Sequence, residues 1–357
     1  MALTDIDSQR LGDSVADKLG DRNLIINGAM QVAQRGTGDT GVTGGPSWAA
    51  DRFRLDISSC GTWTTANTTS SLPSGFSNSI KVDCTSQKPT LTGTNNLFFS
   101  QYIEAQNLQD LAYGTSDAKQ ITLSFWVKSN VTGDFVVELD HGDAGTFNGI
   151  KYTINAANTW EYKTLTFDGD TSNVINNDNG VGLYVQWCLA AGPDLQSGTF
   201  QSNTWQSTTG NRFVGQTNLA ASNTNEWQIT GVQLEVGNTA TPFQHEPYGQ
   251  TLAKCQRYFH KLETSRFVNG YKRADGECYW TYYSPVSMRT TPTPTLVASG
   301  TFSNFNTNFA TTQSNPLVFE YSTSSGCGVL NVTSTWSTTH ASIPVWEAFN
   351  ITFTAEF

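Results

Sequence analysis

The chain has 357 residues, which is enough for two domains or for one large domain with an attached module. Charged residues make up only 14% of it, the net charge is -10, and 37% of the residues are hydrophobic. The apolar content is sufficient for a folded core and excludes a disordered chain. The acidity, with no basic stretch to interrupt it, excludes a nucleic-acid partner.

Neither the beginning of the sequence nor its hydropathy indicates a membrane protein. The opening "MALTDIDSQRLGDSV" lacks the apolar core of a secretory signal. The sequence contains no run of about 18 apolar residues, which a membrane span would need, so we expect no membrane insertion. The six cysteines are far apart and form no CxxC pair. We therefore expect reduced, mostly buried thiols rather than a zinc site.

Residues 1–22 differ in pattern from the rest. Ile6, Leu11, Val15 and Leu19 follow one another at roughly helical steps. A helix this short is marginal in isolation, so it would need a partner to dock against. Two interpretations stay open, a short helical anchor and a frayed N-terminus.

From residue 23 to residue 246 the pattern is that of β-strands. In "QITLSFWVKS" every second residue from Ile121 to Val127 is apolar, and in "VGLYVQWCLAAG" every second residue from Leu183 to Leu189 is apolar. The loops between such runs are dense in Gly, Asn and Asp, which favour turns. Many short strands with polar loops predict an all-β, jelly-roll-like β-sandwich over 23–246.

The stretch "PYGQTLAKCQRYFHKL" interrupts the strand pattern. Leu252, Cys255, Phe259 and Leu262 fall at helical spacing, which predicts a linker helix over 247–262. Alternation resumes afterwards, for example in "ECYWTYYS" and "AFNITFTAEF". Residues 263–357 are therefore expected to form a second, smaller C-terminal β-sandwich.

One cluster of reactive side chains surrounds the linker: Glu235, His245, Glu246, Cys255 and His260. Its spacing matches no HxxxH, HExxH or CxxC motif, so a zinc site is not expected. Val232, Leu234 and Val236 alternate along one face of their strand. Glu235 therefore lies on the opposite face, which we expect to face solvent. We interpret the cluster as structural.

Other acidic residues suggest two further kinds of site. Glycoside cleavage needs two paired carboxylates, but Glu104, Glu138, Asp140 and Glu161 lie on separate runs and no spacing selects a pair. Calcium prefers several oxygen ligands, and "DGDTSNVINNDNG" supplies carboxylates. The loop lacks the glycine and glutamate of an EF-hand, so a turn rich in Asn and Asp is the alternative. The calcium candidates are Asp168, Asp170 and Asp178. No other cofactor is expected.

Sugar binding uses aromatic rings against C–H faces, together with amides and hydroxyls. Trp205 lies in the polar loop "FQSNTWQSTTGN", where we expect it to be exposed. Beyond Arg289 the chain contains no Lys or Arg, which suits either a neutral glycan or an interface between subunits. The glycan-binding candidates are Trp205, Tyr279, Trp280, Tyr282, Tyr283 and Trp336.

Two segments, with strand-like runs between them, carry a resemblance to a known group of proteins. They are "NLIINGAMQVAQRGTG" followed by "WAADRF", and "WQITGVQLEVGNTATPFQHEPYGQTLAKCQRYF". Together with "FFSQYIEAQNLQDL" and "QITLSFWVKS", which lie between them, they resemble cyanophage-like bacteriophage tail-fibre and minor virion structural proteins. The resemblance covers roughly residues 20–262. It implies a carbohydrate-binding-module-like sandwich on a virion appendage, usually a homotrimer.

The sequence therefore predicts a non-enzymatic tail-fibre or spike subunit located on the virion. Residues 1–22 would attach it to phage tail or capsid proteins, and the partner at the cell surface would be a host glycan or lipopolysaccharide. A capsid decoration or head-fibre protein is the first alternative. A glycan depolymerase is the second.

Overall fold

The computed structural model describes residues 22–263, 268–272, 277–298, 301–304, 307–312, 318–319, 327–333, 343–346 and 350–357. The expected N-terminal anchor, apart from Arg22, lies outside these residues. The chain divides into two compact units, 1–246 and 247–357. In the described parts, no helix combines the length and the apolarity needed to cross a membrane.

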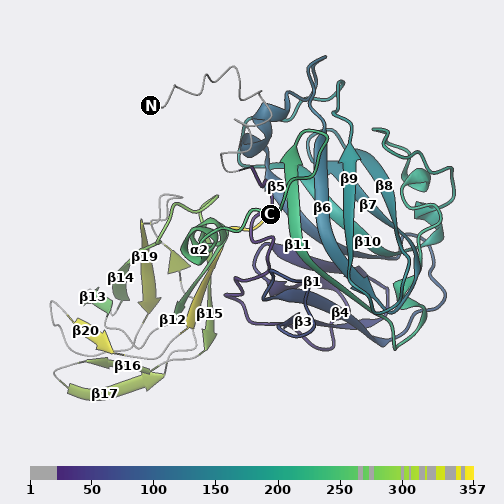
Figure 1. Cartoon of the computed structure of the whole chain (residues 1–357). Helices are drawn as coiled ribbons and strands as arrows, with labels where there is room; N and C mark the ends of the chain where they lie inside the picture. The colour runs from purple at the N-terminus through teal and green to yellow at the C-terminus, as the bar shows by residue number, and fades with distance from the viewer. Residues whose placement is uncertain are drawn as a thin grey trace, which may run out of the picture. The chain divides into compact units, whose positions relative to one another are not determined.

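Unit 1 consists of two antiparallel sheets (Figure 1). The six-stranded sheet has the order β1-β2-β5-β10-β7-β8, with strands Gly45–Ala50, Phe53–Ser58, Asn96–Glu104, Val181–Ala191, Gly133–His141 and Thr146–Ile154. The five-stranded sheet has the order β3-β4-β11-β6-β9, with strands Thr62–Thr68, Ser79–Ser86, Glu226–Val236, Ile121–Ser129 and Glu161–Phe167. The expected all-β, jelly-roll-like fold is confirmed.

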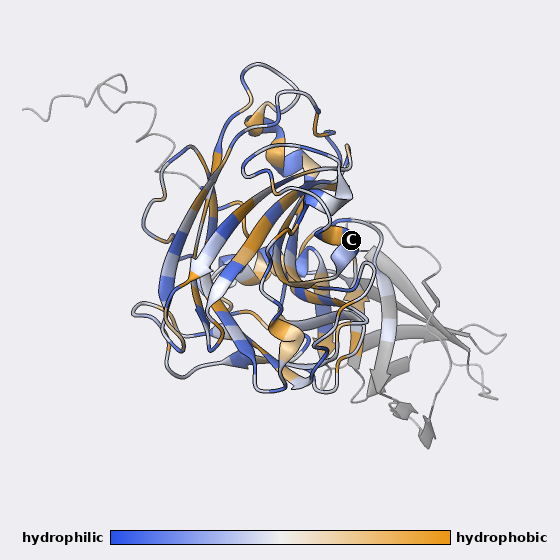
Figure 2. Cartoon of the chain, turned by 90° about the vertical axis from the view of Figure 1, so that its right-hand side faces the viewer, coloured by the Kyte–Doolittle hydropathy of each residue, from blue (hydrophilic) through white to orange (hydrophobic). Residues whose placement is uncertain are grey.

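The main core of unit 1 lies between these two sheets. Phe99 of β5 contacts Trp227 of β11 at a ring-centroid distance of 5.5 Å, and Phe125 of β6 contacts Trp187 of β10 at the same distance. The Trp227 indole also donates a hydrogen bond to the hydroxyl of Tyr152. Apolar and polar colours alternate along the strands (Figure 2). Burying one face of each sheet in this way is the main stabilising interaction of the unit.

A second apolar cluster covers part of the outer face of the six-stranded sheet. The segment 193–217, which contains the 3-10 helices η2 (Pro193–Leu195) and η3 (Thr209–Asn211), lies over β7 and β10. Its residue Phe213 is fully buried and packs on Phe98. The other short helices are η1 (Ala105–Leu111) and η4 (Leu219–Ala221). The part of this outer face around Val136 and Cys188 is thus core, whereas the part around Tyr102 and Tyr184 is partly exposed.

The end of β11 carries a buried polar network, which we call the Glu235 clasp: Arg22, Gln233, Glu235, Thr241 and Gln244. The Glu235 side chain is 4% exposed and accepts hydrogen bonds from the Thr241 backbone, the Thr241 hydroxyl and the Gln233 amide. Gln244 then accepts from the backbone of Arg22. The expectation that Glu235 faces solvent is wrong, because the connector after β11 folds back over the carboxylate.

Unit 2 begins with the helix α2 (Tyr248–Gln256). The predicted helix over 247–262 is too long, because strand β12 (Phe259–Glu263) starts three residues after α2 ends and pairs with β21. Unit 2 contains a three-stranded sheet, β12-β21-β15, and a seven-stranded sheet, β17-β16-β20-β13-β14-β19-β18. The strands after β12 are β13 Val268–Lys272, β14 Glu277–Tyr283, β15 Thr293–Ala298, β16 Thr301–Asn304, β17 Thr307–Thr312, β18 Val318–Phe319, β19 Cys327–Thr333, β20 Ile343–Trp346 and β21 Asn350–Thr354.

We predict that Glu235→Ala destabilises the protein by about 2–4 kcal/mol, because it leaves buried donors of Thr241 and Gln233 without their acceptor. Urea denaturation followed by tryptophan fluorescence measures the change. Asp110→Ala is the control, since that side chain is 76% exposed, and it should shift stability by less than about 0.5 kcal/mol. Equal urea midpoints for Glu235→Ala and the wild type would contradict the role of the clasp.

Candidate functional site

The reactive cluster around the linker does not form one site. Glu235 is committed to the clasp, and His245 is exposed and packs on Phe243 with a centroid distance of 4.8 Å. Cys255 is a buried thiol on α2. His260 lies on β12, where burial lowers its pKa. Among the residues that the structure describes, no group of three or more His, Cys, Asp or Glu side chains could hold a metal ion.

The three calcium candidates serve different local hydrogen bonds. Asp170 is buried and accepts from the backbones of Ser172 and Asn173, which is an Asx turn. Asp168 accepts from the side chain of Gln120, and Asp178 accepts from the backbone of Gly180. The carboxylate of Asp170 in particular has a structural role without any ion.

Trp205 is half-buried, contrary to the expectation of an exposed ring. Its indole N–H donates to the backbone carbonyl of Asp168 over 2.8 Å, and its ring packs edge-on against Tyr113 and His141. It packs against the main core. The polar residues of its loop predict an exposed ring, but the Trp205 ring packs at the end of the sandwich.

The remaining glycan candidates belong to unit 2. Tyr283, at the end of β14, is 72% exposed and offers an accessible ring. The backbones of Tyr279, Trp280 and Tyr282 also lie in β14, but their side chains are outside the described part of the structure. Trp336 lies outside the described residues altogether.

The partly exposed part of the six-stranded sheet gathers aromatic and polar side chains that are far apart in the sequence. Tyr102 of β5 pairs with Tyr184 of β10, which pairs with Asp140 of β7. In the neighbouring row, Arg54 of β2 lies beside β5, and Gln186 lies on β10. Because cross-strand partners share a face, these side chains all point away from the main core. We call Trp48, Arg54, Asp56, Tyr102, Asp140, Tyr184 and Gln186 the ring-lined face.

Stacking and ion pairing hold the rings of this face in place. The guanidinium of Arg54 lies 4.7 Å from the centre of the Tyr102 ring and 5.8 Å from that of Trp48. It also binds Asp56 through two nitrogens, at 2.9 and 2.5 Å. The rings of Tyr102 and Tyr184 meet edge to face at 4.4 Å. The result is a fixed set of rings with its main positive charge already neutralised.

One buried polar atom on the same face lacks a protein partner. Gln186 is 8% exposed, and its Oε1 has no hydrogen-bond partner in the described structure. An unpaired buried acceptor is costly and calls for an explanation. The neighbouring Glu138 is fully buried, and its carboxylate oxygens accept from Arg212.

The ionisation of the face suits hydrogen bonding to a neutral ligand. Burial raises the pKa of Tyr102 to about 12, with the nearby Asp56 acting in the same direction. Burial, with Asp140, also raises the pKa of Tyr184. Both phenols therefore keep their protons at neutral pH and remain donors.

The sequence contained only part of the signal for this face. The alternation of "VGLYVQWCLAAG" assigns Leu183, Val185 and Trp187 to the core, and all three are fully buried. The same alternation puts Tyr184 and Gln186 on the opposite side. The alternation does not show that β10 pairs with β5 and β7, or that β5 pairs with β2, and this pairing brings Arg54, Tyr102 and Asp140 beside them.

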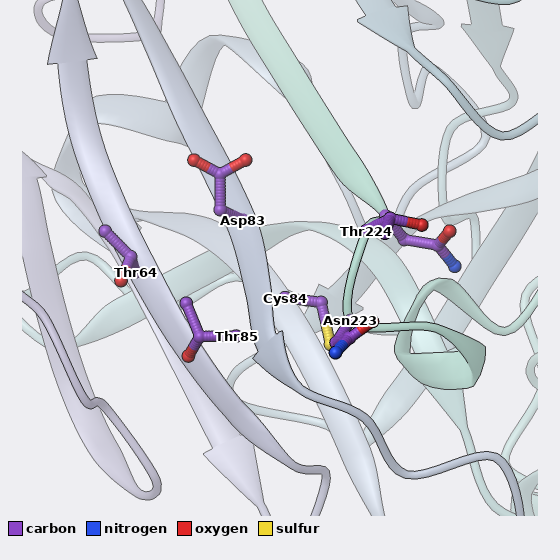
Figure 3. Close-up of a pocket in the computed structure, with 7 residues that line it drawn as sticks. Thr64, Asp83, Cys84, Thr85, Asn223 and Thr224 are labelled. Carbon is purple, nitrogen blue, oxygen red and sulfur yellow. The ribbon is translucent and has the colours of Figure 1, made fainter.

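A separate open depression of about 530 Å³ lies on the outer side of the five-stranded sheet. Figure 3 shows Thr64 on β3, Asp83, Cys84 and Thr85 on β4, and Asn223 and Thr224 on the turn before β11. Hydroxyl, amide and carboxylate groups dominate its lining, and it contains no ring.

No family model matches the chain, and no curated protein matches it. Several solved structures have a similar arrangement. One is the enzymatically active domain of tailspike protein 4 from bacteriophage CBA120, with 14% identity, 60% of this chain covered and a TM-score of 0.33. This chain spans only 21% of that domain. Another is the family 11 carbohydrate-binding module of Clostridium thermocellum in complex with a mixed-linked tetrasaccharide, with 8% identity, coverage of 58% and 99%, and a TM-score of 0.29.

We predict opposite pH effects for two carboxylates of unit 1. Burial raises the pKa of Glu138 from 4.5 to about 7, although Arg212 opposes the shift. Its contribution to stability is thus complete below about pH 4.5 and is lost as the pH rises towards 7. Measured by urea denaturation, the stability of wild type relative to Glu138→Gln should fall over that window.

Glu161 is the matched control for this titration. Its slight burial favours a higher pKa, but hydrogen bonds from Lys163, Ala156 and Asn155 lower the pKa to about 2. Its stabilising contribution is therefore present above about pH 4.5 and is lost as the pH falls towards 2. Parallel pH profiles for Glu138→Gln and the wild type would refute the assignment for Glu138.

Proposed function

We propose that this protein is a non-enzymatic subunit of a virion appendage, a tail fibre or spike, that recognises a glycan on the host surface. The observation that carries the glycan-binding part is the ring-lined face. Its tyrosine and tryptophan rings, guanidinium, carboxylates and buried amide lie on one rigid sheet. Such a combination suits a sugar, whose C–H faces pack on rings while its hydroxyls bond to planar polar groups.

The charges of the face favour a neutral sugar. Arg54 is paired with Asp56, and Arg212 is paired with Glu138. Asp140, which Arg212 contacts at 3.3 Å, adds a further carboxylate beside Tyr184. An acidic sugar would meet an excess of carboxylates, whereas the hydroxyls of a neutral sugar could donate to Asp140.

The carboxylates of unit 1 support binding rather than hydrolysis. A general acid and a nucleophile or base must both reach the glycosidic bond. Glu138 is fully buried under Arg212, and Glu104 is fully buried and accepts from Gln106. Glu161 is held by Lys163 and Asn155. These acids are engaged in structural contacts.

The virion location rests on the resemblance of residues 20–262 to phage tail-fibre and minor virion proteins. The same resemblance suggests a homotrimer. In this proposal residues 1–22 attach the subunit to the particle. A capsid decoration or head fibre is the alternative, and it differs in which virion protein the N-terminal segment binds.

For the glycan, we predict that Tyr102→Ala/Tyr184→Ala lowers affinity about tenfold or more, because each ring contact is worth about 0.5–1.5 kcal/mol. The probe is an array of neutral and acidic oligosaccharides, followed by calorimetry on the best binder. Tyr248→Ala removes a tyrosine that is 56% exposed elsewhere and should bind like the wild type. Tyr102→Phe/Tyr184→Phe, which keeps both rings, should retain most of the affinity. Wild-type protein that binds no glycan on the array would refute the proposal.

For attachment, we predict that deleting residues 1–21 prevents incorporation into virions and leaves glycan affinity unchanged, because the ring-lined face lies entirely within 48–186. Immunogold electron microscopy of purified virions measures both presence and position. Labelling at the tail is expected, and labelling at every capsomer would establish the capsid alternative instead. Normal incorporation of the deletion variant would rule out the N-terminal segment as the anchor.

A further inference from the structure

We infer that the outer side of the five-stranded sheet is a second binding surface for a neutral oligosaccharide, so that unit 1 binds glycan on both of its faces. This inference rests on the proposed glycan recognition and extends it to residues with no part in the ring-lined face. Three adjoining zones make up the surface: the polar depression, a band of paired charges, and an aromatic strip.

The aromatic strip consists of Phe76, Trp126, Trp160 and Tyr162. Trp126 of β6 and Tyr162 of β9 are direct cross-strand partners whose ring centroids lie 5.3 Å apart. Tyr162 is 44% exposed, which is high for so large an apolar ring. Trp160 is fixed by a hydrogen bond of 2.6 Å from its indole to the carbonyl of Ser71. The strip is therefore an ordered set of rings on the water-facing side of the sheet.

A glycine in β11 allows the strip to lie flat against the sheet. Gly231 has a φ of 61° and sits where the register of β11 shifts. A Cβ there would lie 2.6 Å from Cζ of Phe76 and 3.1 Å from Cδ1 of Trp126. Phe76 and Trp126 thus occupy the space that any other side chain at this position would need.

The band of paired charges joins the strip to the depression. Lys81 of β4 binds Asp83 at 2.9 Å and Glu226 at 2.5 Å. Lys128 of β6 lies 5.1 Å from the centre of the Trp160 ring. Two lysines and two carboxylates cancel in formal charge, so the band presents bound polar groups rather than a charged patch. Burial would lower the pKa of Lys81, but its hydrogen bonds and ion pairs with Glu226 and Asp83 raise it overall.

The register of the sheet shows that the three zones form one track. Asp83 of the depression is the partner of Glu226, and the aromatic row begins at Thr230, which is the partner of Trp126. Four residues of strand separate the two rows, which is about 13 Å at the usual rise per residue. Figure 3 shows the depression end of this track, where Asp83 lies between Thr64 of β3 and Thr224 of the turn before β11.

The chemistry of the track selects an uncharged, polyhydroxylated chain as its occupant. Rings at one end can pack on sugar C–H faces, and hydroxyls, amides and Asp83 at the other can bind sugar hydroxyls. A nucleic acid or an acidic polymer would meet a band in which Asp83 and Glu226 balance the charges of Lys81 and Lys128. Two glycan surfaces on one sandwich would also increase the strength of binding to a repetitive polysaccharide through avidity.

The test is calorimetry of the full-length protein with cellohexaose, xylohexaose, mannohexaose and maltohexaose. For the sugar that binds, we expect two molecules per chain in the wild type. One molecule per chain is expected in Trp126→Ala/Tyr162→Ala and also in Tyr102→Ala/Tyr184→Ala. The variant that combines all four alanine substitutions should bind no sugar. Trp126→Phe/Tyr162→Phe, which keeps the rings, should restore the second molecule, and equal urea midpoints would show that the variants are folded.

The outcomes separate this inference from the proposed function. One molecule per chain in the wild type, unchanged in Trp126→Ala/Tyr162→Ala, would overturn the second surface and leave the ring-lined face intact. A loss of self-association in that variant, seen by analytical ultracentrifugation without any change in stoichiometry, would make the strip a subunit interface and also overturn it. Wild-type protein that binds none of these sugars would overturn the second surface, and binding to other glycans on the array would then decide the proposed function.

Discussion

The Glu235 clasp is the constraint on which the layout of unit 1 depends. Glu235 ends the central strand of the five-stranded sheet, and its carboxylate fixes the connector through Thr241. Gln244 of that connector binds the backbone of Arg22. The entry and the exit of the sandwich are thus joined at one corner. Because the carboxylate is buried, loss of any partner leaves a costly polar group without compensation.

This closure determines which surfaces of unit 1 are available. The chain enters beside β11, where Leu24 donates to the carbonyl of Leu234, and leaves from the same strand end. Neither crossing point lies on the ring-lined face, and segment 193–217 packs on the part of the six-stranded sheet around Phe98, Val136 and Cys188 rather than around Tyr102 and Tyr184.

The sequence predicted the features that depend on local periodicity. Alternation identified the core sides of β6 and β10, and it placed Trp126 and Tyr184 away from the core. The features that it missed depend on contacts between distant residues. Phe259 and Leu262 fit helical spacing, so the sequence predicts too long a linker helix. These residues instead lie in β12, which forms through pairing with β21 about 90 residues later. The sequence predicts that Glu235 and Trp205 face solvent, because strand alternation does not reveal the segments that cover them.

The two outer faces of unit 1 both combine partly exposed rings with paired charges. A solvated sheet that displays rings risks non-specific association with other chains. On the six-stranded sheet, Arg54 stacks on Tyr102 and carries Asp56 as its counter-ion. On the five-stranded sheet, Lys81 and its two carboxylates flank Trp126 and Tyr162. In both cases paired charges lie beside the rings, so the surface stays polar. That combination discourages attachment to apolar or charged partners and agrees with the neutral, hydroxylated ligands that we propose for both faces.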